Sequence, residues 1–224
     1  MTLKMKPLNE YIDHTLLKPE ATSGEIIQLC QEAKEYGFYS VCVNSSYVPL
    51  AVAQLKGSGV KVASVVGFPL GAMSTQAKAY EADWVCEKGA LEVDMVLNIG
   101  ALIEGRTQEV KDDIGVVCQF AHEYDAKVKV ILETCLLSKE QIVLACQLAK
   151  EAGGDFVKTS TGFSKGGATL EAVALMKETV GDNMMVKASG GIRDYKTAMV
   201  MIEAGADRLG ASASVSIMKE AQKK

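Results

Sequence analysis

The sequence predicts an α/β fold, a single (β/α)8 or TIM barrel that spans residues 1–224. Short apolar runs of strand length alternate with longer amphipathic segments from one end of the chain to the other. Such alternation is typical of parallel strands joined by right-handed helical crossovers. Eight units within 224 residues make a compact barrel. A doubly wound open sheet is the alternative, but it usually has fewer strands, and no G-x-G-x-x-G sequence opens a helix here.

The predicted strands are apolar runs bounded by Gly, Asn or Thr, as expected for strands buried on both faces. They cover residues 11–14, 39–44, 60–67, 91–97, 127–133, 155–159, 184–188 and 207–210. The first of these has the weakest pattern. The barrel prediction depends on counting it as a strand, because only then does the chain contain eight units.

The segments between these runs carry helix signals at both ends. Two of them begin with the spacing of a capping box, in which two side chains satisfy free backbone N–H groups. Several end at a glycine, which tolerates the left-handed conformation that terminates a helix. The capping boxes are Thr22 with Glu25 and Ser138 with Gln141, and the terminating glycines are Gly37, Gly89, Gly153 and Gly205.

The composition narrows the possible partners. A formal net charge of -4 without a basic cluster argues against nucleic acid and anionic membranes. No apolar stretch approaches the ~20 residues that span a bilayer. Residues 1–10 lack the apolar centre of a signal peptide. We therefore expect a cytoplasmic protein that acts on small molecules.

The inventory of metal ligands is poor. The six cysteines form no C-x-x-C pair, and His14 and His122 lie far apart in the sequence. Neither pattern has the spacing of a zinc site, and the acidic triplets of a magnesium site are missing. We expect reduced cysteines and neither a metal nor another cofactor.

Charged residues interrupt three of the predicted strands. Lys158 and Lys187 follow apolar runs, and Asp94 lies within one. A fully buried Lys or Asp is rare unless it forms an ion pair or has a functional role. A single lysine at the end of a strand could equally extend its amine to solvent. All three at equivalent positions favour a functional role, because reacting groups in barrels lie at the carboxyl ends of the strands.

Lys158 and Lys187 belong to successive strands, which neighbour each other in a barrel at a spacing of about 4.8 Å. Two ammonium groups roughly 5 Å apart repel by about 3 kcal/mol at an effective dielectric near 20, which is roughly two pKa units. Repulsion and burial both favour a free amine, which can attack a carbonyl. The pattern thus predicts an amine nucleophile without choosing between the two lysines. Asp94 could pair with the lysine that stays charged and relay protons.

Loops that contain glycine follow the last two strands, where barrels often bind phosphate. Glycine lets backbone N–H groups approach an anion, and a serine at a helix start can donate to it. The polar stretch 158–167 follows a candidate nucleophile. It is either an ordinary flexible loop or, as its position favours, part of the substrate site. The candidate binding residues in these loops are Gly162, Gly190, Gly191, Gly210 and Ser212.

With these segments placed, the chain resembles the deoxyribose-phosphate aldolase family over its whole length. The two most specific segments are F-V-K-T-S-T-G-F at 156–163 and V-K-A-S-G-G-I-R at 186–193. The others, in order, are I-D-H-T-L-L-K-P at 12–19, V-C-V-N at 41–44, E-V-D-M-V at 92–96, K-V-I-L-E-T at 129–134 and L-G-A-S at 209–212.

The resemblance implies a metal-free class I aldolase that reversibly cleaves 2-deoxy-D-ribose 5-phosphate to D-glyceraldehyde 3-phosphate and acetaldehyde. It implies that Lys158 forms the Schiff base, and that Lys187 perturbs it and shares proton transfer with Asp94. A homodimer is plausible for this family, and the tyrosine-ending tail of some members is missing after Lys224. Residues matched to substrate contacts are Asp13 and Thr15 at the sugar, and Gly190, Gly191, Gly210 and Ser212 at the phosphate.

Two other function classes stay open. One is a phosphate-binding barrel isomerase or synthase in which Lys158 only pairs with the phosphate. The other is an inert barrel that binds a sugar phosphate for regulation. Neither would give an adduct that borohydride traps. For Glu133, a role on the Lys187 side of the site and a surface position are both open. Cys42 is expected in the core, and an approach to the pocket stays open as the alternative.

Overall fold

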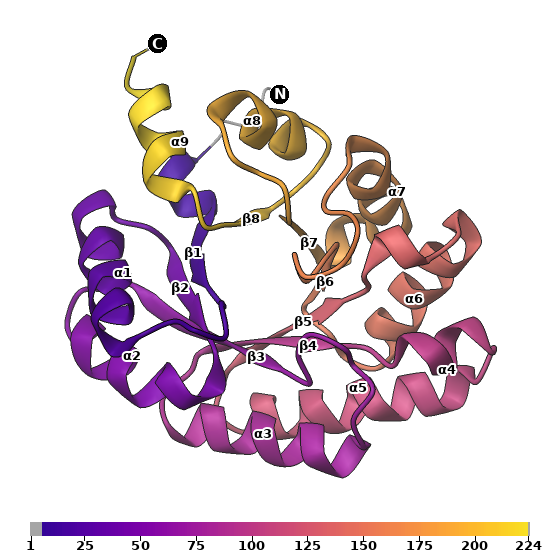
Figure 1. Ribbon diagram of the computed structural model, residues 1–224. Helices are drawn as coiled ribbons and strands as arrows, with labels where there is room; N and C mark the ends of the chain where they lie inside the picture. The colour runs from indigo at the N-terminus through magenta and orange to yellow at the C-terminus, as the bar shows by residue number, and fades with distance from the viewer. Residues whose placement is uncertain (1–5, 224) are drawn as a thin grey trace.

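The protein forms a closed barrel of eight parallel strands surrounded by helices (Figure 1), which confirms the predicted fold class. The computed structural model describes residues 6–223. Residues 1–5 and 224 of the expected domain, and with them half of the segment 1–10, lie outside the described residues. The strands pair in sequence order, and β8 pairs with β1 to close the barrel.

Each predicted strand is present, and its bounds differ from the predicted ones by at most two residues at either end. The strands are β1 (Ile12–Leu16), β2 (Ser40–Val43), β3 (Lys61–Val66), β4 (Glu92–Val96), β5 (Lys127–Ile131), β6 (Phe156–Lys158), β7 (Met185–Ser189) and β8 (Arg208–Ala211).

The helices lie outside the strands and cover them from all sides (Figure 1). They are α1 (Ser23–Tyr36), α2 (Val48–Leu55), α3 (Thr75–Glu87), α4 (Ile99–Ile103), α5 (Thr107–His122), α6 (Lys139–Glu151), α7 (Leu170–Val180), α8 (Tyr195–Glu203) and α9 (Ser214–Ala221). Short 3-10 turns occupy Leu8–Tyr11, Ser45–Tyr47, Thr134–Leu136 and Gly181–Asn183. In the described part of the chain, no helix combines the length and apolar character needed to cross a membrane.

The weakest predicted strand differs most from its expected position. The sequence placed it at 11–14, whereas β1 begins at Ile12 and continues to Leu16. Tyr11 belongs instead to a 3-10 turn. Polar side chains at Asp13 to Thr15 hide this strand in the sequence. Backbone pairing still extends it, because Thr15 and Leu16 align with Cys42 and Val43 of β2.

The helix ends follow the predicted capping signals. Both capping boxes form at the starts of α1 and α6, with each side chain bonded to the backbone of the other residue. Gly37 caps α1 in the left-handed conformation, at φ 63°. Local sequence signals therefore fix where these helices begin and end, before any tertiary contact is considered.

Strand side chains point alternately to two buried layers. The larger layer, between the sheet and the helices, is an apolar core that includes Val41, Val93, Val130 and Val157. The barrel interior contains a small apolar cluster of Leu17, Cys42, Ala63 and Val65, with Phe68 packed against it. Other interior positions carry ionisable side chains, and the strand register brings these side chains together.

Candidate active site

A cavity of about 280 Å³ opens at the carboxyl ends of the strands. It extends from the end of β6 to the loops that follow β7 and β8. Seven of the residues predicted for the site line it: Thr15, Lys158, Gly162, Gly190, Gly191, Gly210 and Ser212. Asp94, Lys187 and Asp13 are not among its lining residues and are wholly buried in the barrel interior.

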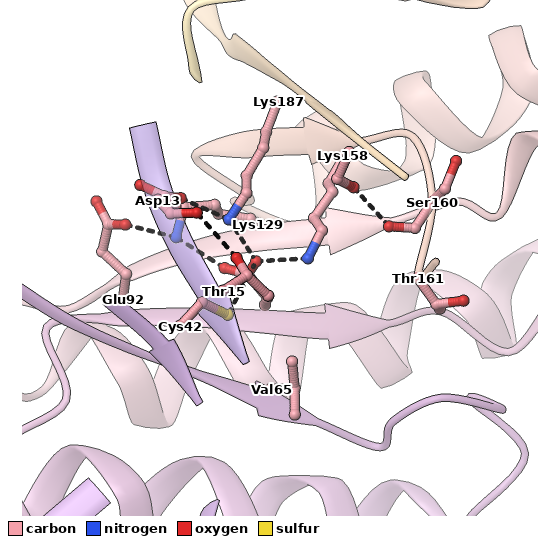
Figure 2. Close-up of polar contacts among 12 residues, drawn as sticks. Asp13, Thr15, Cys42, Val65, Glu92, Lys129, Lys158, Ser160, Thr161 and Lys187 are labelled. Carbon is pink, nitrogen blue, oxygen red and sulfur yellow. Dashed lines mark hydrogen bonds and ion pairs between the residues drawn. The ribbon is translucent and has the colours of Figure 1, made fainter. Parts of the chain in front are cut away.

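Lys158 and Lys187 occupy the same level of neighbouring strands, as the sequence suggested, because they are partners in the β6–β7 register. Both amines meet one oxygen of Asp94: Oδ2 lies 2.7 Å from Nζ of Lys158 and 2.8 Å from Nζ of Lys187. Figure 2 shows the side chains of Lys158 and Lys187 extending from neighbouring strands into the same cluster of polar contacts. The two lysines differ in access, since Lys158 lines the cavity and Lys187 has no exposed surface.

The surroundings separate the two amines electrostatically. Burial lowers the pKa of Lys158; the Asp94 carboxylate raises it and the Lys187 ammonium lowers it, and the net pKa lies below the usual value. Burial also lowers the pKa of Lys187, but the carboxylates of Asp13 and Asp94 outweigh it, and the net pKa is raised. Lys158 is therefore the amine that loses its proton more readily, and Lys187 is the one that keeps its proton.

Asp94 stays ionised despite its burial. Burial alone would raise the pKa of its carboxyl group, but Lys129, Lys158 and Lys187 hold the pKa well below its usual range. Its second oxygen, Oδ1, accepts a hydrogen bond from Nζ of Lys129 at 2.7 Å. A fixed carboxylate therefore separates the candidate nucleophile from two permanent cations.

Sequence reasoning assigned no role to Lys129, Glu92 and Arg208, all of which are buried in the same interior. Nζ of Lys129 lies 2.6 Å from Glu92, and the guanidinium of Arg208 lies 3.2 Å from Glu92. The positions of Glu92 and Lys129 could have indicated a role. Glu92 lies two residues before Asp94 on the same strand, so its side chain faces the same side of the sheet. Lys129 is the register partner of Asp94.

Asp13, which the resemblance places at the sugar, is wholly buried and is not among the residues that line the cavity. It lies two residues before Thr15 on β1, which places it one side-chain layer deeper in the barrel. Its carboxylate pairs with Lys187 at 2.5 Å and with Arg208 at 2.8 Å. Thr15, in contrast, lines the cavity. Asp13 thus contacts two buried cations, Lys187 and Arg208.

Glu133 is buried, not at the surface, and its contacts lie on the Lys158 side of the site. It follows β5 in the left-handed conformation, at φ 56°. Its carboxylate accepts hydrogen bonds from the backbone N–H and the hydroxyl of Thr161. Glu133 therefore holds the loop that follows Lys158. Cys42 lies in the core as expected, with Sγ 4.0 Å from Asp94, and burial raises its pKa to about 11.

The loops after β6 and β7 are tied to each other by backbone contacts. The N–H of Ala168 donates to the carbonyl oxygens of Ser189 and Gly190, both at 3.0 Å. A Cβ on Gly167 would lie 2.2 Å from the Gly190 oxygen, so only glycine fits there. Gly190 and Gly191 have φ values of 84° and 80°, which favour glycine. Close packing at Gly167 and Gly190, and positive φ at Gly190 and Gly191, thus favour glycine in these loops.

The cavity has a cationic part and an apolar part. Lys18 and Arg193, both exposed, line it together with the glycine loops and Ser212. Phe163 lines it too and packs edge-on against Phe68, with ring centroids 5.2 Å apart. Among residues 6–223, no group of three or more His, Cys, Asp or Glu side chains is placed to hold a metal ion. The cavity therefore brings together the amine of Lys158, the exposed cationic side chains of Lys18 and Arg193, and the glycine-containing loops.

Comparisons with known proteins agree with this chemistry. A family model described as DeoC/LacD family aldolase matches residues 9–219. Deoxyribose-phosphate aldolase from Alkaliphilus oremlandii is 61% identical over 211 residues, which cover 94% of this chain and 95% of that protein. The same enzyme from Carboxydothermus hydrogenoformans is 60% identical over 212 residues, covering 94% of this chain and 93% of that protein.

Solved structures give the same result. A putative deoxyribose-phosphate aldolase from Coccidioides immitis superposes with a TM-score of 0.93 at 45% identity, covering 97% of this chain and 87% of that one. The resemblance drawn from the sequence motifs is confirmed. The chain belongs to the DeoC/LacD family of aldolases.

Proposed function

We propose that the protein is a class I aldolase that reversibly cleaves 2-deoxy-D-ribose 5-phosphate to D-glyceraldehyde 3-phosphate and acetaldehyde. The observation that carries this proposal is the amine of Lys158, which lines the cavity and lies 2.7 Å from a carboxylate that cannot easily be protonated. The names of the relatives at about 60% identity support the choice of substrate.

In this proposal Lys158 attacks C1 of the open-chain sugar as a free amine, and loss of water gives an iminium ion. A base drawn from Asp94 and a water molecule takes the proton of the 3-hydroxyl group, and the Lys187 ammonium acts as a hydrogen-bond donor beside it. The C2–C3 bond then breaks, and its electron pair moves to the iminium to give an enamine. D-Glyceraldehyde 3-phosphate leaves. Protonation of the enamine and hydrolysis of the imine release acetaldehyde and restore the amine.

The permanent cation of Lys187 supports each proton transfer without itself entering the cavity. Asp13 and Asp94 keep it protonated, so it can donate a hydrogen bond to a water or hydroxyl group that carries negative charge. We propose that Asp13 contributes by holding Lys187 and not by touching the sugar. Positioned acid–base groups of this kind typically contribute roughly 10²–10⁴-fold to the rate.

The phosphate is proposed to bind where the glycine loops meet the start of α9. Gly190, Gly191 and Gly210 offer backbone N–H groups, and Ser212 and Arg193 add a hydroxyl and a positive charge. A homodimer stays a prediction. The related aldolase from Aeropyrum pernix, which superposes with a TM-score of 0.91 at 35% identity over 96% of this chain and 91% of that one, is described as tetrameric.

Borohydride reduction in the presence of acetaldehyde, followed by peptide mass mapping, tests the covalent step. We expect an ethyl group on Lys158, because imine formation requires a neutral amine within the cavity. Lys165, exposed on the same loop and absent from the cavity lining, is the internal control for non-specific alkylation. An adduct on Lys187 would reverse the two lysine roles, and labelling no faster than at Lys165 would favour a phosphate-binding isomerase.

Ser212→Asp tests the phosphate site. A carboxylate at the cavity wall should repel the phosphate dianion and lower kcat/KM for 2-deoxy-D-ribose 5-phosphate roughly 10- to 100-fold, as expected for one or two unit-charge repulsions near a protein surface. With unphosphorylated 2-deoxy-D-ribose, kcat/KM should stay unchanged. Ser216→Asp, an exposed position on α9 away from the cavity, is the matched control. Equal losses with both sugars would place the phosphate elsewhere.

A further inference from the structure

Six buried side chains below the cavity form a closed ring of ion pairs. Each member contacts the next at 3.2 Å or less, and the last contacts the first. Three carboxylates alternate strictly with three cations, so the ring as a whole has no net charge. In order, this charge ring consists of Asp94, Lys129, Glu92, Arg208, Asp13 and Lys187.

Lys158 contacts the charge ring at one point, the Oδ2 atom of Asp94. With a neutral amine at Lys158, the charges of the interior balance. With an ammonium there, the interior carries one positive charge that no anion within it compensates, which is costly in a buried site. The titratable groups facing the Lys158 amine are Asp94 of β4, Lys187 of β7 and Cys42 of β2, with Lys129 of β5 on the far oxygen of Asp94.

Glu92 and Arg208 close the ring on the side away from the substrate. Neither lines the cavity, and neither has a direct contact with Lys158. One nitrogen of Arg208 contacts both Asp13 and Glu92, at 2.8 and 3.2 Å. The guanidinium lies 3.4 Å from the ring centroid of Tyr39, which fixes its plane. Arg208 therefore holds Asp13, and Glu92 holds Lys129, on the side of the ring away from the cavity.

We propose that Glu92 and Arg208 are positioning residues for the aldolase reaction, which close the charge ring and so set the net charge beneath the amine of Lys158. The proposal rests on the proposed Schiff-base function. In this proposal the net charge of the ring controls how readily the Lys158 amine loses its proton. Any loss of an anion should favour the neutral amine, and any loss of a cation should favour the ammonium form.

Two single variants with opposite signs test this proposal. Glu92→Gln leaves the ring with one excess positive charge, and the acid limb of the kcat/KM profile should move to lower pH. Arg208→Gln leaves one excess negative charge, and the limb should move to higher pH. Each shift should be about one pH unit, as expected for a unit charge on the order of 10 Å away at an effective dielectric of about 20.

The double variant Glu92→Gln/Arg208→Gln restores neutrality, and its acid limb should return to the wild-type midpoint. Arg208→Lys, which keeps the charge, should also keep that midpoint. The same pH dependence should appear in the rate at which acetaldehyde and cyanoborohydride label Lys158. A purely structural role would lower activity in both single variants without shifts of opposite sign.

Shifts of the same sign in both single variants, or no shift in either while circular dichroism shows the folded protein, would overturn the proposal. If a single variant fails to fold, the neutral double variant and Arg208→Lys test the proposal instead. A shifted acid-limb midpoint in either of them would contradict the control of Lys158 by the net charge of the ring. Absence of any Lys158 adduct in the wild-type protein would instead contradict the proposed function itself. The two failures are therefore distinguishable.

Discussion

Replacement of Lys158 by arginine should abolish cleavage of 2-deoxy-D-ribose 5-phosphate. A guanidinium keeps its proton at any pH at which the protein is folded, and it cannot form an imine. We expect kcat/KM to fall by about 10⁴-fold or more, on the scale seen when a covalent nucleophile is removed. The fold should survive, because Lys158 lies at the cavity wall and is not a member of the charge ring in the barrel interior. A coupled assay for D-glyceraldehyde 3-phosphate measures the loss.

Lys165→Arg is the matched control for this variant, since Lys165 follows on the same loop but does not line the cavity. It should retain wild-type turnover. The Lys158→Arg protein should also lose the acetaldehyde adduct. Turnover near that of the wild-type protein in Lys158→Arg would contradict the Schiff-base assignment, whatever the result at Lys165.

Lys187→Leu should give the second largest effect, a loss of roughly 10²–10⁴-fold in kcat from the missing proton-transfer group. It should also change the pH dependence. The Lys187 ammonium is one of the causes that lower the pKa of Lys158, so its removal raises that pKa. Because the reaction needs the neutral amine, the acid limb of the pH–rate profile should move to higher pH.

Lys187→Arg is the control, because it retains the cation that Asp13 and Asp94 both contact. Its acid limb should lie close to that of the wild-type protein even if its rate is lower. An unchanged profile in Lys187→Leu, with the folded state confirmed by circular dichroism, would show that the neighbouring cation does not govern Lys158.

Much of the fold could be predicted because the signals are local. Capping boxes, terminating glycines and apolar runs each act over a few residues, and they placed the eight strands and the ends of α1 and α6. The first strand was placed too early because its side chains are polar. Its extent depends on pairing with β2 and β8, which no local pattern reveals.

The candidate site could be predicted only in part, for a related reason. Lys158, Lys187 and Asp94 stand out as charges in apolar runs. Glu92, Lys129 and Arg208 are also charged residues in apolar runs. Their contacts with one another depend on the strand register and on barrel closure, which bring β4, β5, β8 and β1 together around one interior. The two lysines could not be told apart in sequence, because burial and the position of Asp13 distinguish them.

The backbone contact between Gly167 and Gly190 joins the two ends of the cavity. The loop after β6 carries the segment next to Lys158, and the loop after β7 lies at the proposed phosphate site. Binding energy gained at a distant anion can be used to order the groups that react. An anion that immobilises Gly190 therefore also immobilises the segment that follows the nucleophile. If the phosphate binds at the proposed site, it would act as a remote activator, and we expect a sugar without it to lose turnover as well as affinity.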